Sequence, residues 1–418
     1  MSKLTHTDIV DLLDGNISEL SDFESDTDSV GEIDELLENF DENKTFELLD
    51  YNDVENVNDF PEIDVPEPSS SPWNAPLLLI KKKVDASGKE KFRIVIDFRA
   101  LNQVTLNEFH PLPNITQILD HLGQCQLFSV IDLTSGFHQI PLSEASRELT
   151  AFSANNAHYH FKRIAMGMKT NPSTFQRLMD NVLSGIIGIK CLVYLDDIII
   201  YGKNLIDHKN KLIDVFERLR MHNLKIQPDK CEFVKRECIY LGYVISETGI
   251  RPDPKKIQAV LGFPEPKNVK QIKSFLGLSG YYRKYIKNDS AIAKPITNLL
   301  KNNVEFNWSD ECDRTFGKLK HALCTEPVLQ YPDFTKEFIL TTYASGKALY
   351  AILSQKEIGR DLPIAYASRT LSPSEFNYST TELKCLTIVY GFKQFRPYLY
   401  GRNITILSVH RPLACYSI

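Results

Sequence analysis

Residues 191–202, CLVYLDDIIIYG, constrain the fold of this chain more than any other segment. Two adjacent carboxylates, Asp196 and Asp197, stand between two short runs of Val, Ile, Leu and Tyr. Such apolar runs are typical of buried strands, so the acidic pair between them predicts the tip of a β-hairpin. Two carboxylates held together in a partly dry place raise each other's pKa unless a cation neutralises them.

A third carboxylate, Asp132, ends another strand-like run, LFSVID at 127–132. Three carboxylates at neighbouring strand ends could hold two divalent metal ions, which lie about 3.5–4 Å apart in phosphoryl transfer and bind the attacking and leaving oxygens. Mg²⁺ suits such a site, because it binds through one or two carboxylates plus substrate phosphates. The alternative is a hairpin turn without chemistry, since turns favour Asp.

Charge is distributed unevenly along the chain. The first 70 residues hold 22 acidic and 2 basic side chains, whereas the remainder holds 32 acidic and 46 basic ones. The overall charge of −6 therefore combines an acidic leader with a body of net charge +14. A basic body is typical of proteins that bind nucleic acid, although a solvated basic surface is the alternative.

The eight cysteines are scattered and include no C-x-x-C pair. This spacing argues against a zinc knuckle and a disulfide framework and favours a reducing compartment. No N-terminal apolar run resembles a signal peptide, and no stretch approaches the ~20 apolar residues of a membrane span. These features predict an intracellular protein, cytoplasmic or nuclear, that does not span a membrane.

Residues 1–66 are expected to be a disordered leader, because a segment such as 21–29, SDFESDTDS, carries too much charge to bury. Two short amphipathic patches, at 9–13 and 33–37, favour either a partner-binding motif or a solvated tail with incidental apolar residues. The sequence does not identify a protein partner for this leader.

Beyond the leader, hydrophobic patterning predicts a long hairpin formed by residues 77–80 and 92–96. Residues 253–325 are predicted to be mainly helical, and a further helix is predicted across Thr380–Phe395. The segment GYYRKY at 280–285 interleaves aromatic and basic residues. It predicts either a nucleic-acid-binding surface or a helix whose tyrosines are core.

Several further blocks occur in a characteristic order. Together they resemble the reverse transcriptases of LTR retrotransposons, most of all the gypsy group of insect elements, over residues 67 to 418. Besides 127–140 and the YLDD hairpin, the blocks are SSSPWNAP at 69–76, KFRIVIDFR at 91–99, HPLP at 110–113, LKI at 224–226, DKCEF at 229–233, YLG at 240–242 and FLGLSGYYRK at 275–284.

The resemblance implies an α+β fold. It would be a right-hand polymerase of fingers, palm and thumb, followed by a connection and an incomplete RNase-H-like α/β domain. We therefore expect reverse transcriptase fingers and palm at 67–252, thumb and connection at 253–325, and a truncated RNase-H-like domain at 326–418.

The resemblance also implies an activity, RNA-directed DNA polymerase. Asp132, Asp196 and Asp197 match the family's catalytic carboxylates, which hold two Mg²⁺ ions, with Mn²⁺ as a substitute. The substrates would be dNTPs and a primer annealed to an RNA or DNA template.

Further residues are candidates for contacts with the incoming nucleotide or the primer. Arg93 matches the arginine that contacts the incoming triphosphate, with Lys82 and Lys83 as nearby candidates or solvated hairpin charges. Phe137 matches the aromatic gate that excludes a 2′-hydroxyl, and Tyr194 matches a residue that packs against the primer terminus. A core role is the alternative for both aromatic residues.

The C-terminal part resembles the family's RNase H domain, but its carboxylates are replaced. Tyr343 and Val409 stand where the family has Asp, and Lys384 stands where it has the catalytic Glu. Glu382 matches an adjacent Glu that is not catalytic. Since Tyr, Lys and Val do not hold Mg²⁺, we expect no cleavage of an RNA strand.

Two functions remain open at this point. One is a working reverse transcriptase that carries an inactive RNase H domain. The other is a decayed or co-opted copy that binds nucleic acid without catalysis. The intact polymerase carboxylates favour the first, and the degenerate RNase H positions and the unusual acidic leader favour the second.

Overall fold

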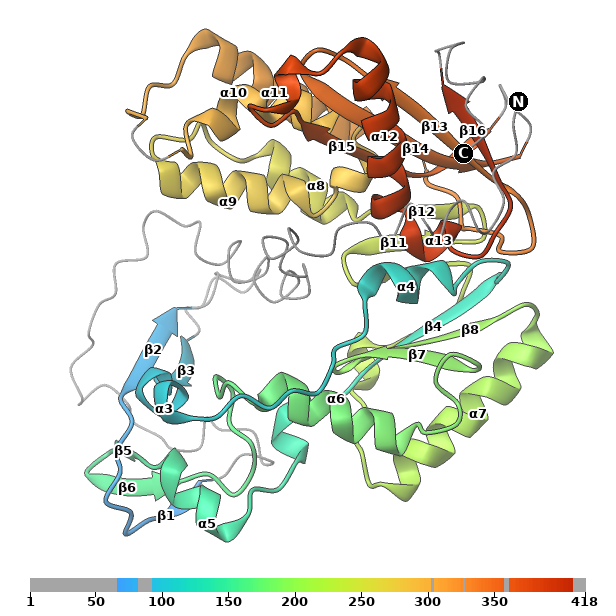
Figure 1. Ribbon diagram of the computed structural model, residues 1–418. Helices are drawn as coiled ribbons and strands as arrows, with labels where there is room; N and C mark the ends of the chain where they lie inside the picture. Colours follow the sequence, from blue (N-terminus) through green and yellow to red (C-terminus); the bar gives the residue numbers. More distant parts are fainter. Residues whose placement is uncertain (1–65, 82–91, 302–303, 326–327, 357–360, 409–418) are drawn as a thin grey trace. The chain divides into compact units, whose positions relative to one another are not determined.

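The computed structural model describes residues 66–81, 92–301, 304–325, 328–356 and 361–408 (Figure 1). These residues divide into two compact units. The hairpin unit contains the described residues up to Ile118 together with Cys125–Cys238, and the C-terminal unit contains Leu119–Gln124 and the described residues from Ile239 onward. The predicted boundaries at 66/67, 252/253 and 325/326 stay predictions.

The hairpin unit is built around a four-stranded sheet in the order β7-β8-β4-β9, whose strands pair antiparallel. Two helices cover one of its faces, with Phe175 and Val215 among the apolar side chains that meet the sheet residues (Figure 1). The predicted hairpin around Asp196 and Asp197 is confirmed. These elements are β4 (Leu127–Asp132), β7 (Cys191–Tyr194), β8 (Asp197–Gly202), β9 (Glu232–Lys235), α6 (Asn171–Val182) and α7 (Leu205–Met221).

The rest of the hairpin unit contains a two-stranded and a three-stranded sheet. The predicted strands at 77–80 and 92–96 are confirmed as an antiparallel pair with Leu77 opposite Ile96, and the predicted turn between them lies outside the described residues. The elements are β1 (Glu67–Pro68), β2 (Leu77–Lys81), β3 (Phe92–Ile96), α3 (Arg99–Val104), η2 (Gly136–Gln139), α5 (Glu144–Arg147), η3 (Glu148–Thr150), β5 (Phe152–Ala154), β6 (Ala157–His160), η4 (Pro228–Lys230) and α4 (Ile115–Asp120), whose last two residues are assigned to the C-terminal unit.

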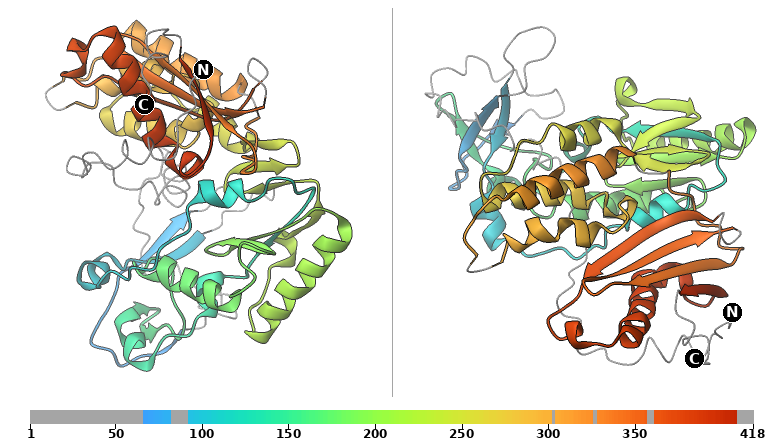
Figure 2. Two further views of the ribbon diagram at one scale, coloured as in Figure 1. Left: turned by 45° about the vertical axis from the view of Figure 1, so that its right-hand side comes forward. Right: turned by 90° about the horizontal axis from the view of Figure 1, so that it is seen from above.

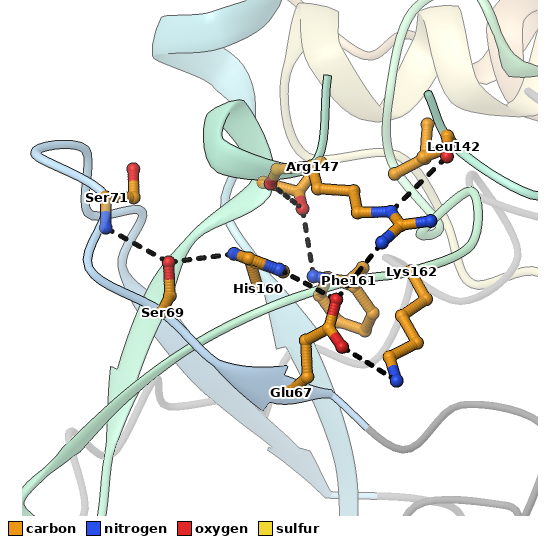
Figure 3. A network of polar contacts seen from close by, with 9 residues as sticks. Glu67, Ser69, Ser71, Leu142, Arg147, His160, Phe161 and Lys162 are labelled. Carbon is orange, nitrogen blue, oxygen red and sulfur yellow. Dashed lines mark hydrogen bonds and ion pairs between the residues drawn. The ribbon is translucent and has the colours of Figure 1, made fainter. Parts of the chain in front are cut away.

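A polar network holds β1 against β6 and α5 (Figure 3). The Glu67 carboxylate lies 2.7 Å from Lys162 Nζ, 3.1 Å from His160 Nε2 and 3.3 Å from Arg147 Nη1. The hydrogen bonds from Lys162 and His160 hold the pKa of Glu67 below its ordinary value. His160 Nδ1 also lies 2.8 Å from Ser69 Oγ, so the network ties down the start of the SSSPWNAP block.

Replacing Glu67 by Gln is expected to lower the thermal stability of the hairpin unit at neutral pH. Because the folded-state pKa of Glu67 is depressed, its stabilisation is present above the unfolded pKa near 4.5 and is lost as pH falls through the folded pKa. The melting temperatures of wild type and Glu67→Gln should therefore differ at pH 7 and converge as the pH falls below the folded-state pKa of Glu67. The exposed Glu144 provides the control; an equal effect of Glu144→Gln would contradict this role.

The C-terminal unit begins with a three-stranded sheet and four α-helices, which confirms the mainly helical prediction for 253–325. Asn268 caps α9 by accepting a hydrogen bond from the Gln271 N–H, and the buried Ile272 and Phe275 form its core face. The elements are β10 (Glu237–Tyr240), β11 (Tyr243–Ser246), β12 (Gly249–Pro252), α8 (Pro254–Leu261), α9 (Val269–Gly280), η5 (Arg283–Tyr285), α10 (Asp289–Asn298) and α11 (Asp310–Thr325).

A second sheet, in the order β15-β14-β13-β16, follows in the same unit. Figure 2 shows α12 lying against one face of this sheet. Ile388 and Phe392 of the helix belong to the same buried cluster as Phe338 and Leu340 of the sheet. This helix confirms the prediction for 380–395. The elements are β13 (Phe338–Ala344), β14 (Ala348–Gln355), β15 (Leu362–Thr370), η6 (Glu375–Asn377), α12 (Thr380–Gln394), α13 (Arg396–Leu399) and β16 (Ile404–Ser408).

The GYYRKY segment is mainly a core element. The side chains of Tyr282 and Tyr285 are fully buried, and both rings pack on Tyr243. Lys284 Nζ lies 4.9 Å from the centre of the Tyr243 ring, and burial lowers the pKa of Lys284 to about 8. The core alternative therefore holds for these tyrosines.

No helix among the described residues is long and apolar enough to cross a membrane.

Candidate active site

Strand pairing brings the predicted carboxylates together. Asp132 at the end of β4 lies directly opposite Asp197 at the start of β8, and Tyr194 at the end of β7 lies opposite Asp197 on its other side. Residues directly opposite each other in an antiparallel pair have Cβ atoms about 4.5–5.5 Å apart. Asp196 occupies the two-residue turn between β7 and β8, next to this pair.

Burial and mutual repulsion disfavour the charge of the acidic turn. Burial raises the pKa of Asp196, and the nearby Asp132 carboxylate raises it further, whereas Lys230 acts in the opposite direction. Lys230, on η4, places its Nζ 3.4 Å from Asp132 Oδ2. The side chain of Lys230 is 63% exposed, so its charge is screened by water and compensates the carboxylates only in part.

The carboxylates have the donor chemistry for Mg²⁺, although they do not form a closed cage. Among the residues that the structure describes, no three His, Cys, Asp or Glu side chains are grouped closely enough to hold a metal ion. Mg²⁺ does not need such a cage, because it takes one or two protein carboxylates and completes its shell with water and substrate phosphates. Metal binding by Asp132, Asp196 and Asp197 therefore stays a prediction.

Residues of η2 and α6 pack closely against the turn that carries Asp196. A Cβ atom on Gly136, the first residue of η2, would lie 3.2 Å from Asp196 Cβ and 3.1 Å from Phe175 Cζ. Gln176, the next residue of α6, is fully buried and accepts a hydrogen bond of 2.8 Å from the Leu195 N–H. The sequence drew no attention to Gln176, because a single polar residue on an amphipathic helix gives no distinct signal.

The comparisons with known proteins agree with this geometry. Residues 80–245 match the family model of the reverse transcriptase (RNA-dependent DNA polymerase), and residues 308–406 match the RNase H-like domain found in reverse transcriptase. The chain is 47% identical over 346 residues to the retrovirus-related Pol polyprotein from transposon 297 of Drosophila melanogaster, an alignment that covers 82% of this chain and 32% of that polyprotein. The chain therefore contains reverse transcriptase and RNase H-like regions similar to those of gypsy-type retrotransposon Pol polyproteins.

Other relatives and solved structures point the same way. The Pol polyprotein from transposon gypsy of Drosophila melanogaster is 42% identical over 362 residues, covering 83% of this chain and 34% of that polyprotein. A structure of the foamy viral protease-reverse transcriptase in complex with ds DNA aligns with a TM-score of 0.74 at 25% identity, covering 84% of this chain and 62% of that one. The predicted α+β polymerase fold is confirmed. The chain spans about a third of the length of the curated relatives it matches.

Within this Pol fold, Phe137 and Tyr194 lie close to the acidic turn but differ in exposure. Phe137 on η2 is half-buried and packs edge-to-face on Phe175, with ring centres 5.3 Å apart. Tyr194 is only 6% exposed, which favours its core alternative. Phe137 as a gate against a 2′-hydroxyl, and Tyr194 as a contact of the primer, stay predictions.

Of the predicted triphosphate-binding residues, Arg93 alone lies among the residues that the structure describes. Arg93 stands on β3, with its backbone opposite Ile80 of β2. Lys82 and Lys83 lie outside the described residues. The Lys230 contact with Asp132 was not predicted: the DKCEF block drew attention to this segment without suggesting a role.

The RNase-H-like region of the Pol chain holds the replaced positions on β13 and α12. Tyr343 on β13 is 56% exposed and its ring stacks on Tyr350 with centres 5.9 Å apart. Lys384 lies in the first half of α12, and Val409 lies outside the described residues. Glu382 closes a capping box with Ser379 at the start of α12, a structural role that agrees with its match to a non-catalytic Glu.

Proposed function

We propose that this chain is an RNA-directed DNA polymerase that extends a primer annealed to an RNA or DNA template with dNTPs. The observation that carries the proposal is the pairing of Asp132 with Asp197 on adjacent strands, with Asp196 in the turn beside them. Its relatives are Pol polyproteins of retrotransposons, and the foamy viral enzyme of similar fold was solved with ds DNA.

Two divalent ions, Mg²⁺ or Mn²⁺, would when bound activate the primer 3′-hydroxyl and stabilise the departing pyrophosphate. Asp132, Asp196 and Asp197 are the residues that would hold them, and the raised pKa of Asp196 supports this role. Phe137 would border the sugar of the incoming nucleotide, and Arg93 would bind its phosphates through its planar guanidinium group. An intracellular location, cytoplasmic or nuclear, is supported by the described cysteines, none of which forms a disulfide.

Primer extension by the purified chain tests the proposal. The wild type is expected to extend a DNA primer on an RNA template with dNTPs and Mg²⁺, and Asp197→Asn is expected to abolish extension while it still binds the duplex. A folded wild type that binds the duplex without extending it would instead establish the second candidate, a non-catalytic nucleic-acid-binding protein. The replaced positions at Tyr343 and Lys384 are what favour that candidate.

We expect no cleavage of the RNA strand in an RNA/DNA hybrid. Tyr343 and Lys384 supply no carboxylate, and Lys384 would repel a metal ion. The measurement is a cleavage assay with end-labelled RNA in a hybrid, in Mg²⁺ and in Mn²⁺, with Tyr343→Asp/Lys384→Glu as a gain-of-function comparison. Metal-dependent cleavage by the wild type that is lost in Glu382→Gln would contradict the prediction.

A further inference from the structure

Leu195, which lies between Tyr194 and Asp196, adopts a backbone conformation that leucine does not favour. Leu195 has φ +54°, in the left-handed region where side chains other than Gly are uncommon. Such conformations cost on the order of 1–3 kcal/mol and persist only where the surrounding structure holds them. Because Leu195 immediately precedes Asp196, whatever holds its peptide also sets the direction of the acidic turn.

Gln176 holds this peptide. Its Oε1 accepts the hydrogen bond from the Leu195 N–H at 2.8 Å, and its side chain is fully buried. A buried amide can present either its oxygen or its nitrogen to a neighbour, since the two groups have nearly the same shape. Only the oxygen can accept from the Leu195 N–H, so the orientation of this amide decides whether the turn is held.

Asp180 sets that orientation. Gln176 Nε2 donates to Asp180 Oδ1 at 2.9 Å, one helical turn along α6. A carboxylate accepts hydrogen bonds, so it requires the amide nitrogen on its own side and directs the amide oxygen toward Leu195. The other oxygen of Asp180 lies 2.7 Å from His110 Nε2, in the HPLP block that precedes α4.

We propose that His110, Asp180 and Gln176 form a positioning relay that fixes the acidic turn through the Leu195 peptide. The relay contacts the turn only through the Leu195 N–H and does not contact the reacting atoms. Through Asp180 and His110 it links the conformation of the turn to the HPLP segment. The effect of the relay on catalysis rests on the proposed polymerase function, whereas the hydrogen bond to Leu195 is independent of that function. Partners of this kind, one step behind metal ligands, typically change metal affinity or activity about 10–100-fold when they are replaced.

A pair of isosteric changes isolates the relay. Gln176→Glu retains oxygen atoms that could accept from the Leu195 N–H, but it sets two carboxylates against each other, because Asp180 remains an acceptor. We expect this repulsion to displace the carboxylate at position 176 and to weaken its hydrogen bond with Leu195. Adding Asp180→Asn reverses the direction of the hydrogen bond between the two positions. The amide nitrogen introduced at position 180 then donates to the carboxylate introduced at position 176, and the amide oxygen still faces His110. We therefore expect Gln176→Glu to be impaired and Gln176→Glu/Asp180→Asn to be largely restored.

The activity readout is the rate of single-nucleotide incorporation at saturating dNTP, measured against Mg²⁺ concentration. Gln176→Glu should lower this rate about 10–100-fold and raise the Mg²⁺ concentration needed for half-maximal rate, with primer–template affinity unchanged. Asp214→Asn is the matched control, because Asp214 lies on α7, pairs with Lys190 and makes no contact with the three residues of the relay in its ion pair; its replacement should leave the rate unchanged. Restoration in the double variant is the result that a general packing defect would not produce.

Amide hydrogen exchange of residues 194–197 tests the relay without reference to activity. The Leu195 amide should exchange faster in Gln176→Glu than in the wild type and regain protection in the double variant. If the wild type does not extend primers, the proposed function is wrong, but the hydrogen-exchange measurement still tests whether the relay holds the Leu195 peptide. Wild-type protection of Leu195 in Gln176→Glu, or an unchanged incorporation rate in an active enzyme, would overturn it.

Discussion

Asp196→Asn should reduce nucleotide incorporation by about 10³-fold or more, because loss of a charged ligand from a two-metal site removes several kcal/mol of transition-state stabilisation. The same substitution should not destabilise the folded chain. Burial and the neighbouring Asp132 raise the pKa of Asp196, which means that the folded protein in the absence of metal disfavours this charge. Asn has the same shape without the charge, so we expect the free energy of unfolding without metal to stay equal or rise.

A substitution that lowers activity without lowering the free energy of unfolding indicates that the original side chain serves catalysis and not stability. The measurement pairs single-turnover incorporation with urea unfolding in EDTA for wild type, Asp196→Asn and the control Asp214→Asn. Asp214 forms an ion pair with Lys190 away from the turn, so its replacement should leave incorporation unchanged. An Asp196→Asn protein that incorporates nucleotides at the wild-type rate would remove Asp196 from the site.

Gly202→Ala is expected to destabilise the fold strongly. Gly202 ends β8, and an added Cβ would lie 2.6 Å from His208 Cβ, 2.8 Å from its Cα and 2.9 Å from its N. Two of these atoms are backbone of α7, which cannot turn aside as a flexible side chain would. His208 itself is fully buried and its Nε2 lies 2.7 Å from Ser129 Oγ, so the helix is held in place.

Overpacking of this kind costs about 1–3 kcal/mol and sometimes more, and Gly202→Ala should lie at the upper end. Gly317 is the matched control: it lies within α11, and an added Cβ would meet nothing within 4 Å. Gly317→Ala should therefore stabilise its helix, by up to about 1 kcal/mol. Urea midpoints of the two variants should shift in opposite directions, and a Gly202→Ala midpoint equal to wild type would show that β8 and α7 separate easily.

Local patterns were sufficient to predict several strands and helices. The apolar runs beside Asp196 and Asp197 predicted β7 and β8, and helical spacing predicted α12 and the helical stretch that contains α9, because the periods of strands and helices are visible within a short window. The tyrosines at 281–285 show where this reasoning stops. Their pattern suits a nucleic-acid surface and a buried core equally well, and only the contacts with Tyr243 decided between them.

The sequence by itself determined which chemical groups this chain has: the three carboxylates of the proposed polymerase site, and Tyr343 and Lys384 at positions where the RNase H resemblance predicts carboxylates. Only the tertiary structure decided which groups meet. It paired Asp132 with Asp197, placed Lys230 beside Asp132 and set Gln176 beneath the turn. The reason is physical: residue type and periodicity are local, whereas partners distant in sequence come together only when whole strands and helices pack.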